Sequence, residues 1–412
     1  MKKESKQWLL VATLLAAVFL VGGSGYNTVP VFLPVLVKQF GWSRVRVSML
    51  PSVLAASAGL GYVVVGWLLD RVAARYVMVV GALIAGLAFI VASRATSFAP
   101  MMVAYALLGL GISGATLIPA SLVVASWFRA RRGLVMSIVA AGASAGGMLM
   151  TVFAGHIIGR WGWRVAYVGL ALPIFLILVP LLVSVVRNRP VETEMQSVSP
   201  KRSAEIDGFE TGEAVGTRSF WMIMVAQLCF SLSVSGVLVH LVAYLVEVGY
   251  TAGSVALIMA SIFGLNAVGK VCIGSFADVV GARIALFVNF VLEAIALLLA
   301  LQERNVAVLI VFVPVLGSVL GAPIALVPLL IAECTGLKRF GSVSGLVGIA
   351  STVGAILGSI IVGRIFDLTT NYASALLVFS GVAFAGAFAT LACRTYRMER
   401  LRSPVPSLAA EV

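Results

Sequence analysis

Twelve long apolar runs constrain this chain more than any other feature of its sequence. Each run is about 18 to 30 residues long and nearly free of charge, enough for a helix to cross the ~30 Å hydrocarbon core of a bilayer. The runs occupy roughly residues 8–37, 45–69, 76–93, 99–127, 133–159, 164–186, 219–246, 253–276, 283–302, 306–333, 341–363 and 371–393. Because a spanning segment must satisfy its own backbone hydrogen bonds, the sequence predicts an all-α membrane protein with twelve transmembrane helices.

Composition and terminal features support this class. Of 412 residues, 61% are hydrophobic and 11% charged, whereas soluble domains are about half apolar and about a quarter charged. Lys2, Lys3 and Lys6 precede the first run as in a signal peptide, but no clear cleavage motif follows, which predicts an uncleaved first helix. The four cysteines form no metal or disulfide spacing. No nucleotide loop or nucleophile triad occurs either, so we expect no enzyme, no cofactor and no metal.

The basic residues are distributed unevenly between the two sides of the predicted membrane. If both termini are cytoplasmic, 20 of the 29 lysines and arginines lie inside, 8 outside and 1 within the membrane. This positive-inside pattern predicts a multi-pass protein of the cell (inner) membrane. Orientation and anionic lipid then account for the net charge of +13. We therefore expect a lipid bilayer as a partner, no nucleic acid, and a monomer.

One polar stretch divides the apolar runs into two groups of six. Residues 187–218 mix charged residues with Ser, Thr and Gly and lack apolar periodicity. We predict that they form a mobile cytoplasmic linker between six-helix bundles at residues 1–186 and 219–394. Residues 395–412 would form a cytoplasmic tail.

An internal repeat relates the two halves. A shift of 208 residues places Asp70 on Asp278 and Arg75 on Arg283. Seven first-half glycines also fall on second-half glycines, namely Gly41, Gly61, Gly66, Gly109, Gly133, Gly146 and Gly155 on Gly249, Gly269, Gly274, Gly317, Gly341, Gly354 and Gly363. Glycine permits the close approach that sliding membrane helices need. A repeat of this kind predicts a pseudo-twofold, two-domain transporter.

One basic residue lies deep inside a predicted spanning helix. Lys270 falls within the run 253–276, and Asn266 precedes it by one helical turn on the same face. An ammonium group in hydrocarbon is costly unless it faces a cavity or a partner, so such a residue marks a functional site. Tyr62 is the repeat counterpart of Lys270 and should face the same cavity from the opposite half. We predict that these residues bind an anionic substrate.

Two loop segments carry matching motifs. GWLLDRVAARYVMVVGA contains Asp70, Arg71 and Arg75, and GSFADVVGARIALF contains Asp278 and Arg283. Both segments resemble the motif that the major facilitator superfamily has between helices 2 and 3 and between helices 8 and 9. The resemblance implies the fold of that superfamily. It also implies a gating role, in which the carboxylate caps a neighbouring helix N-terminus and pairs with loop arginines in one conformer.

Within that superfamily the chain resembles the monocarboxylate transporter family and its oxalate/formate antiporter relatives. FGWSR after the first run and SWFRARRGLVMSIVAAGASAG at the fourth and fifth runs support this likeness. Asn266, Lys270 and Gly274 stand where that family has an acidic residue, an arginine and a glycine. Lysine differs from arginine in being a point charge rather than a bidentate fork. Leu117 stands near the position of a helix 4 tyrosine in some relatives and is a further substrate-site candidate.

Several other polar residues lie in the predicted helices. Tyr26 could hydrogen-bond a substrate, although helix packing explains it equally well. His240 could couple protons, because a histidine titrates near neutral pH, but a packing or interfacial role is the alternative. A desolvated lysine can also release its proton, so Lys270 is a second candidate for proton coupling. Glu293 is expected to be a neutral or locally paired structural acid.

Together these features predict secondary active transport of small monocarboxylates, such as lactate or pyruvate, by alternating access around Lys270. One membrane charge suits one carboxylate better than two. Proton symport follows from the family resemblance, since the residues themselves form no obvious proton relay. The alternatives are exchange of organic anions such as oxalate and formate, and export of hydrophobic compounds. An alternative of another class is a sensor that binds a carboxylate without moving it.

Overall fold

The chain folds almost entirely into helices. The structure is a computed structural model, and it describes residues 2–128, 131–186, 208–250, 252–302, 306–369, 371–396 and 398. Within these ranges twelve helices are long and apolar enough to cross a membrane, which confirms the predicted all-α membrane fold. Residues 187–207 of the predicted linker, and the predicted tail apart from residues 395, 396 and 398, lie outside the described residues.

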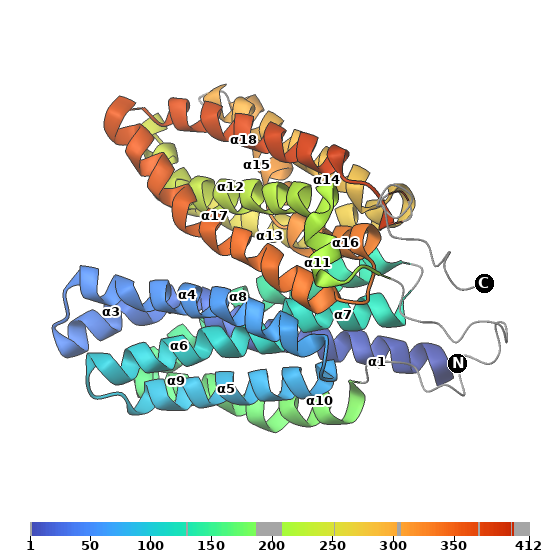
Figure 1. Cartoon of the computed structure of the whole chain (residues 1–412). Coiled ribbons are helices and arrows are strands. Elements are labelled where there is room, and N and C mark those ends of the chain that lie inside the picture. The colour runs from blue at the N-terminus through green and yellow to red at the C-terminus, as the bar shows by residue number, and fades with distance from the viewer. Residues whose placement is uncertain are drawn as a thin grey trace.

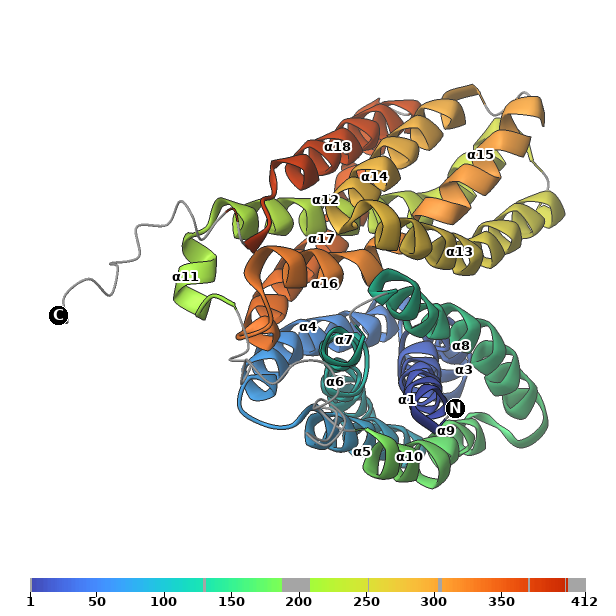
Figure 2. The ribbon, with the colours of Figure 1, turned by 90° about the vertical axis from the view of Figure 1, so that its right-hand side faces the viewer.

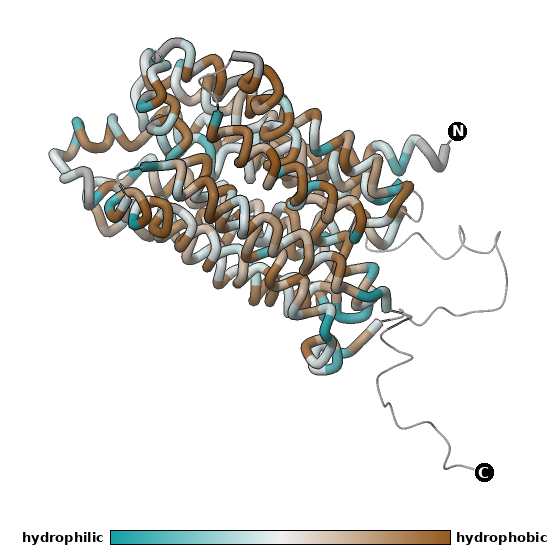
Figure 3. The backbone as a smooth tube through the Cα atoms, turned by 90° about the horizontal axis from the view of Figure 1, so that it is seen from above, coloured by the Kyte–Doolittle hydropathy of each residue, from teal (hydrophilic) through white to brown (hydrophobic). Residues whose placement is uncertain are grey.

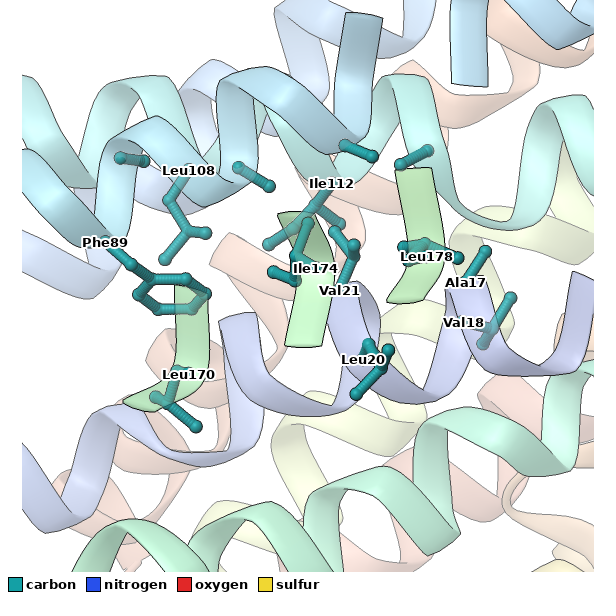
Figure 4. Packing of buried hydrophobic residues seen from close by; sticks show 14 of the residues in the cluster. Ala17, Val18, Leu20, Val21, Phe89, Leu108, Ile112, Leu170, Ile174 and Leu178 are labelled. Atoms are coloured by element: carbon teal, nitrogen blue, oxygen red, sulfur yellow. The ribbon is translucent and has the colours of Figure 1, made fainter. Parts of the chain in front are cut away.

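The helices up to residue 186 form a first bundle (Figure 1). They are α1 (Lys2–Ala17), a π-helical segment (Val18–Gly23), α2 (Ser24–Asn27), α3 (Val29–Phe40), α4 (Arg44–Leu69), α5 (Ala74–Arg94), α6 (Phe98–Ala115), α7 (Leu117–Trp127), α8 (Arg132–Trp161), α9 (Trp163–Pro173), a second π-helical segment (Ile174–Leu178) and α10 (Val179–Val185). Their inner faces share one apolar core, in which Val21, Ile112 and Ile174 lie together (Figure 4). Leu60 and Leu176 point outward instead and are 71% and 69% exposed, as expected of helices that face lipid.

The helices from residue 211 onward form a second bundle. They are α11 (Thr211–Gly216), α12 (Arg218–Val248), α13 (Ala252–Val280), α14 (Ala282–Leu299) with a 3-10 turn (Ala300–Gln302), α15 (Val306–Val319), α16 (Ala322–Thr335), α17 (Phe340–Thr369) and α18 (Tyr372–Ala392). This bundle buries separate apolar clusters, one around Phe290 and Leu330 and another around Phe312 and Phe379. Apolar residues predominate along the helices of both bundles (Figure 3). Each bundle therefore has a core of its own.

Two of the predicted spanning helices are broken near their middle. The run 99–127 divides into α6 and α7 at Thr116, whose backbone leaves the helical region at φ −111° and ψ −123°. Pro119 follows closely and has no backbone N–H to continue the hydrogen-bond ladder. The run 306–333 divides into α15 and α16 at Gly321, with Pro323 near the start of α16. Such breaks put irregular backbone at membrane depth, which is tolerated where it is buried in protein or lines a cavity.

The end of the predicted linker is more ordered than expected. Residues 211–216 form α11, whose start is fixed by a capping box between Glu210 and Glu213. The Glu210 carboxylate also binds Arg339 at 2.7 Å and Lys338 at 3.0 Å, and these contacts hold the pKa of Glu210 below its ordinary value. Local capping and ion pairing thus order this part of a segment that lacks apolar periodicity.

The two bundles meet along two helix pairs, α4 with α17 and α8 with α13. A Cβ atom at Gly66 would lie 2.3 Å from the carbonyl oxygen of Gly341, and one at Gly133 would lie 2.2 Å from that of Gly274. Glycine is therefore required for this approach. The shift of 208 residues places Gly66 on Gly274 and Gly133 on Gly341, so the two contacts are equivalent under the repeat.

These contacts lie toward one end of the molecule. We call the helix ends near the starts of α1 and α12 the terminus side, and the opposite ends the far side. Figure 2 views the terminus side and shows α16 and α17 against α4 and α7. In Figure 1 the ribbons of the bundles converge toward the terminus side and spread toward the far side.

Candidate functional site

Lys270 lies at the junction of the two bundles. Its side chain projects from α13 and is only 3% exposed. The ammonium Nζ donates a hydrogen bond of 2.8 Å to the Ser144 hydroxyl on α8 of the first bundle. That hydroxyl in turn donates to Oδ1 of Asn266 at 3.3 Å. The predicted pair therefore lies in one hydrogen-bonded group, and the group spans the interface.

The break between α15 and α16 in the second bundle also lies against this hydrogen-bonded group. A Cβ atom at Gly321 would lie 2.3 Å from Cε of Lys270 and 2.5 Å from Oδ1 of Asn266. The break between α15 and α16 thus lets backbone approach both side chains. Ser144 and Gly321 were missed by the sequence analysis. No local pattern marks either residue, because each joins the site only through the packing of helices that are distant in sequence.

The charge of Lys270 has no acidic partner among the described residues. Its hydrogen bond goes to a neutral hydroxyl, and its side chain is almost fully buried. A buried cation without a counter-ion is costly. The site is consequently suited to an anion that supplies the missing negative charge.

The two tyrosine candidates lie together at the other helix pair. The Tyr26 and Tyr62 side chains lie close enough to interact with each other. Tyr62 packs on α17, because a Cβ atom added at Gly348 would lie 3.0 Å from the Cβ atom of Tyr62. Tyr26 is 41% exposed. The structure thus brings these two residues to each other at the interface, and their role in substrate binding stays a prediction.

Both motif aspartates cap a helix of the opposite bundle on the terminus side. Oδ1 of Asp70 accepts from the backbone N–H of Gly341 at 3.0 Å, and Oδ2 accepts from that of Ser342 at 3.1 Å and from its hydroxyl. Asp278 accepts in the same way from the first turn of α8, at 2.6 Å from Gly133 N and 2.9 Å from Leu134 N. A carboxylate at a helix N-terminus is favoured by the helix dipole. The two caps hold the bundles together on this side.

The three motif arginines contact other groups in this conformation. The Arg71 guanidinium stacks 3.8 Å from the ring centroid of Trp67. Arg75 donates to the carbonyl of Val183 at 3.3 Å, and Arg283 donates to that of Cys393 at 3.1 Å. Within the described residues, none of the three forms an ion pair with the motif aspartates. Arg75 thus joins the start of α5 to the end of α10 in the first bundle, and Arg283 joins the start of α14 to the segment after α18 in the second.

The remaining candidates lie apart from the Lys270 group. The His240 ring lies 5.7 Å from that of Tyr372, and it lines an apolar pocket with Tyr244 and Phe379 inside the second bundle. Leu117 is the first residue of α7 and packs, partly buried, against the core of the first bundle. Glu293 on α14 is 1% exposed. None of these positions is shown to contact Lys270.

Two repeat-related helix bundles that meet around a buried cation have the architecture of a secondary transporter. Comparison with known proteins gives the same class. The family model of the Major Facilitator Superfamily matches residues 14–271. The chain therefore belongs to the major facilitator superfamily, and it is a multi-pass membrane transporter rather than an enzyme.

The individual relatives are distant in sequence, but the similarity extends over most of each chain. The chain is 26% identical over 344 residues to "MFS-type transporter 1" of an Ophiocordyceps species, covering 82% of this chain and 73% of that protein. It is 26% identical over 415 residues to Monocarboxylate transporter 3 of Rattus norvegicus, covering 95% and 81% of the two chains. Its fold matches the proton:xylose symporter XylE with a TM-score of 0.76 at 14% identity, covering 97% of this chain and 99% of that one.

Proposed function

We propose that this transporter carries small monocarboxylates, such as lactate or pyruvate, across the cell membrane. The observation that supports this most is the buried Lys270 ammonium, which lacks an acidic partner in the described part of the chain. A substrate carboxylate would pair with Nζ, and the Asn266 side chain would orient it. The similarity to a monocarboxylate transporter over nearly the whole chain points in the same direction.

Alternating access would follow from the two bundles and their caps. With Asp70 and Asp278 in place, the terminus side would be closed and substrate would enter from the far side. Release would require α4 to separate from α17, and α8 from α13. We infer that the terminus side is cytoplasmic, in agreement with the positive-inside pattern, and that protons move with the substrate.

Uptake into proteoliposomes tests this proposal. The purified protein would be given labelled lactate, pyruvate, formate and oxalate, with and without a pH gradient. We expect lactate and pyruvate to accumulate, faster when the side of entry is acidic, and oxalate to be excluded. Preference for oxalate, with exchange but no response to pH, would favour an anion exchanger. Binding of lactate without uptake would favour a sensor, and no binding of any of the acids would overturn the proposal.

A further inference from the structure

The hydroxyl of Ser144 occupies the position that a substrate oxygen would need. It accepts a hydrogen bond from Lys270 Nζ at 2.8 Å while its own proton is donated to Asn266. The lone pairs of the oxygen are thereby directed at the ammonium, as those of a carboxylate oxygen would be. Since Lys270 is only 3% exposed, an anion that binds Nζ has to displace a group that already packs against it.

Ser144 also lies farther from the terminus side than the Asp278 cap, the other described polar contact between α8 and α13. Toward the terminus side the same two helices are joined by the Gly133–Gly274 contact and by the Asp278 cap. Toward the far side, Met148 and Val152 continue the Ser144 face of α8 at four-residue spacing. They are 65% and 69% exposed. Among the described polar contacts between α8 and α13, the Ser144 group is thus the one nearest the far side.

We propose that Ser144 is an internal ligand of Lys270 that the substrate displaces, and that this exchange couples substrate binding to the separation of α8 from α13. The inference rests on the proposed function, because it assigns Lys270 an anionic substrate. A carboxylate forms a stronger, charge-assisted bond with the ammonium than a neutral hydroxyl does. Once displaced, Ser144 no longer links the bundles, and the equilibrium shifts toward opening of the terminus side.

The chain offers a matched control in Ser137. It lies on α8 two turns from Ser144, and its hydroxyl would lie 1.9 Å from a Cβ atom at Gly274, so it occupies the same helix interface. In contrast to Ser144, its buried hydroxyl has no hydrogen-bond partner in the described structure. Ser137→Ala therefore removes an interfacial hydroxyl without removing a bond between the bundles.

The test compares Ser144→Ala, Ser144→Thr and Ser137→Ala with the parent protein. Lactate affinity is measured by calorimetry. Opening of the terminus side is measured from spin labels at Val72→Cys and Val279→Cys, one in each bundle and 37% and 85% exposed, after replacement of the native cysteines. We expect Ser144→Ala to bind lactate about tenfold more tightly, because the competing bond is lost. Without ligand, more of the Ser144→Ala protein should already have the long distance between the labels at residues 72 and 279 that marks an open terminus side. Lactate should therefore lengthen that distance less than it does in the parent protein.

Ser144→Thr keeps the hydroxyl, so its lactate affinity and its label distance should equal those of the parent protein. Ser137→Ala should equal the parent protein in both quantities as well. Weaker lactate binding by Ser144→Ala would overturn the inference and make Ser144 a direct substrate ligand. Unchanged ligand-free distances in Ser144→Ala would also overturn it. If the parent binds none of the four acids, the proposed function and the displacement by substrate both fail. The ligand-free distances would still decide whether Ser144 links the bundles.

Discussion

Asn266 and Lys270 share one face of α13 but contribute differently to the site. In the proposed complex Asn266 would orient the substrate carboxylate through one hydrogen bond from its neutral amide, and such a bond is worth about 1 kcal/mol. Asn266→Ala should therefore weaken lactate binding only about fivefold in calorimetry. Ser275→Ala is a suitable control, because the Ser275 hydroxyl binds the Val271 carbonyl of its own helix. A loss of a hundredfold or more would mean that Asn266, rather than Lys270, dominates binding.

At the same scale, Glu293 is the buried acid that the proposed transport does not use. Ser233 is the polar side chain beside its carboxyl group, but neither carboxyl oxygen forms a hydrogen bond of normal geometry among the described residues, and neither does either side-chain polar atom of neighbouring Asn289. An unpaired ionised carboxylate would be very costly there, so we infer a neutral group. Glu293→Gln should then unfold within a few degrees of the parent in a thermal melt and keep proton-dependent uptake. Loss of the response to pH, with the fold intact, would show that Glu293 carries protons.

Among the elements, the two capped helices should control conformation rather than affinity. A charge at a helix N-terminus contributes about 0.3–1 kcal/mol, so Asp70→Asn should shift the equilibrium toward an open terminus side by about two- to fivefold. Asp278→Asn should do the same, because the repeat makes the two caps equivalent. The spin-label distance between residues 72 and 279 measures this shift, and uptake rates should change with it. A folded variant that lost most of its lactate affinity would contradict a gating role.

The sequence predicts helices better than it predicts how they meet. Apolar runs locate the spanning helices because each must satisfy its own backbone and cover a fixed thickness. The repeat also anticipates that Asp70 and Asp278 occupy equivalent places. By contrast, Ser144 and Gly321 join the site only through the packing of α8 and the break before α16, which no local pattern specifies. The order of α11 was missed because it depends on Arg339, which is distant in sequence.

For the whole molecule, the orientation in the membrane is the first prediction to test. Single cysteines at Gly212 and Gly159, in a background without native cysteines, report on the terminus side and the far side. An added Cβ atom meets no neighbour within 4 Å at either position. In intact cells an impermeant thiol reagent should label Gly159→Cys at once and Gly212→Cys only after the membrane is opened. The reverse pattern would invert the topology and the direction of entry.

In the proposed transport mechanism, a substrate carboxylate binds the Lys270 ammonium. Removing one partner of a buried charge pair costs about 3–5 kcal/mol, so Lys270→Gln should bind lactate at least a hundredfold more weakly. Lys270→Arg should keep partial activity with altered selectivity among acids, because it retains the charge but changes the geometry.

The most direct measurement is uptake of labelled lactate by Lys270→Gln in proteoliposomes, beside the parent and Lys270→Arg, with folding checked by size-exclusion chromatography. We predict nearly complete loss of uptake in Lys270→Gln and partial uptake in Lys270→Arg. Transport of lactate by well-folded Lys270→Gln at near the parent rate would contradict this prediction.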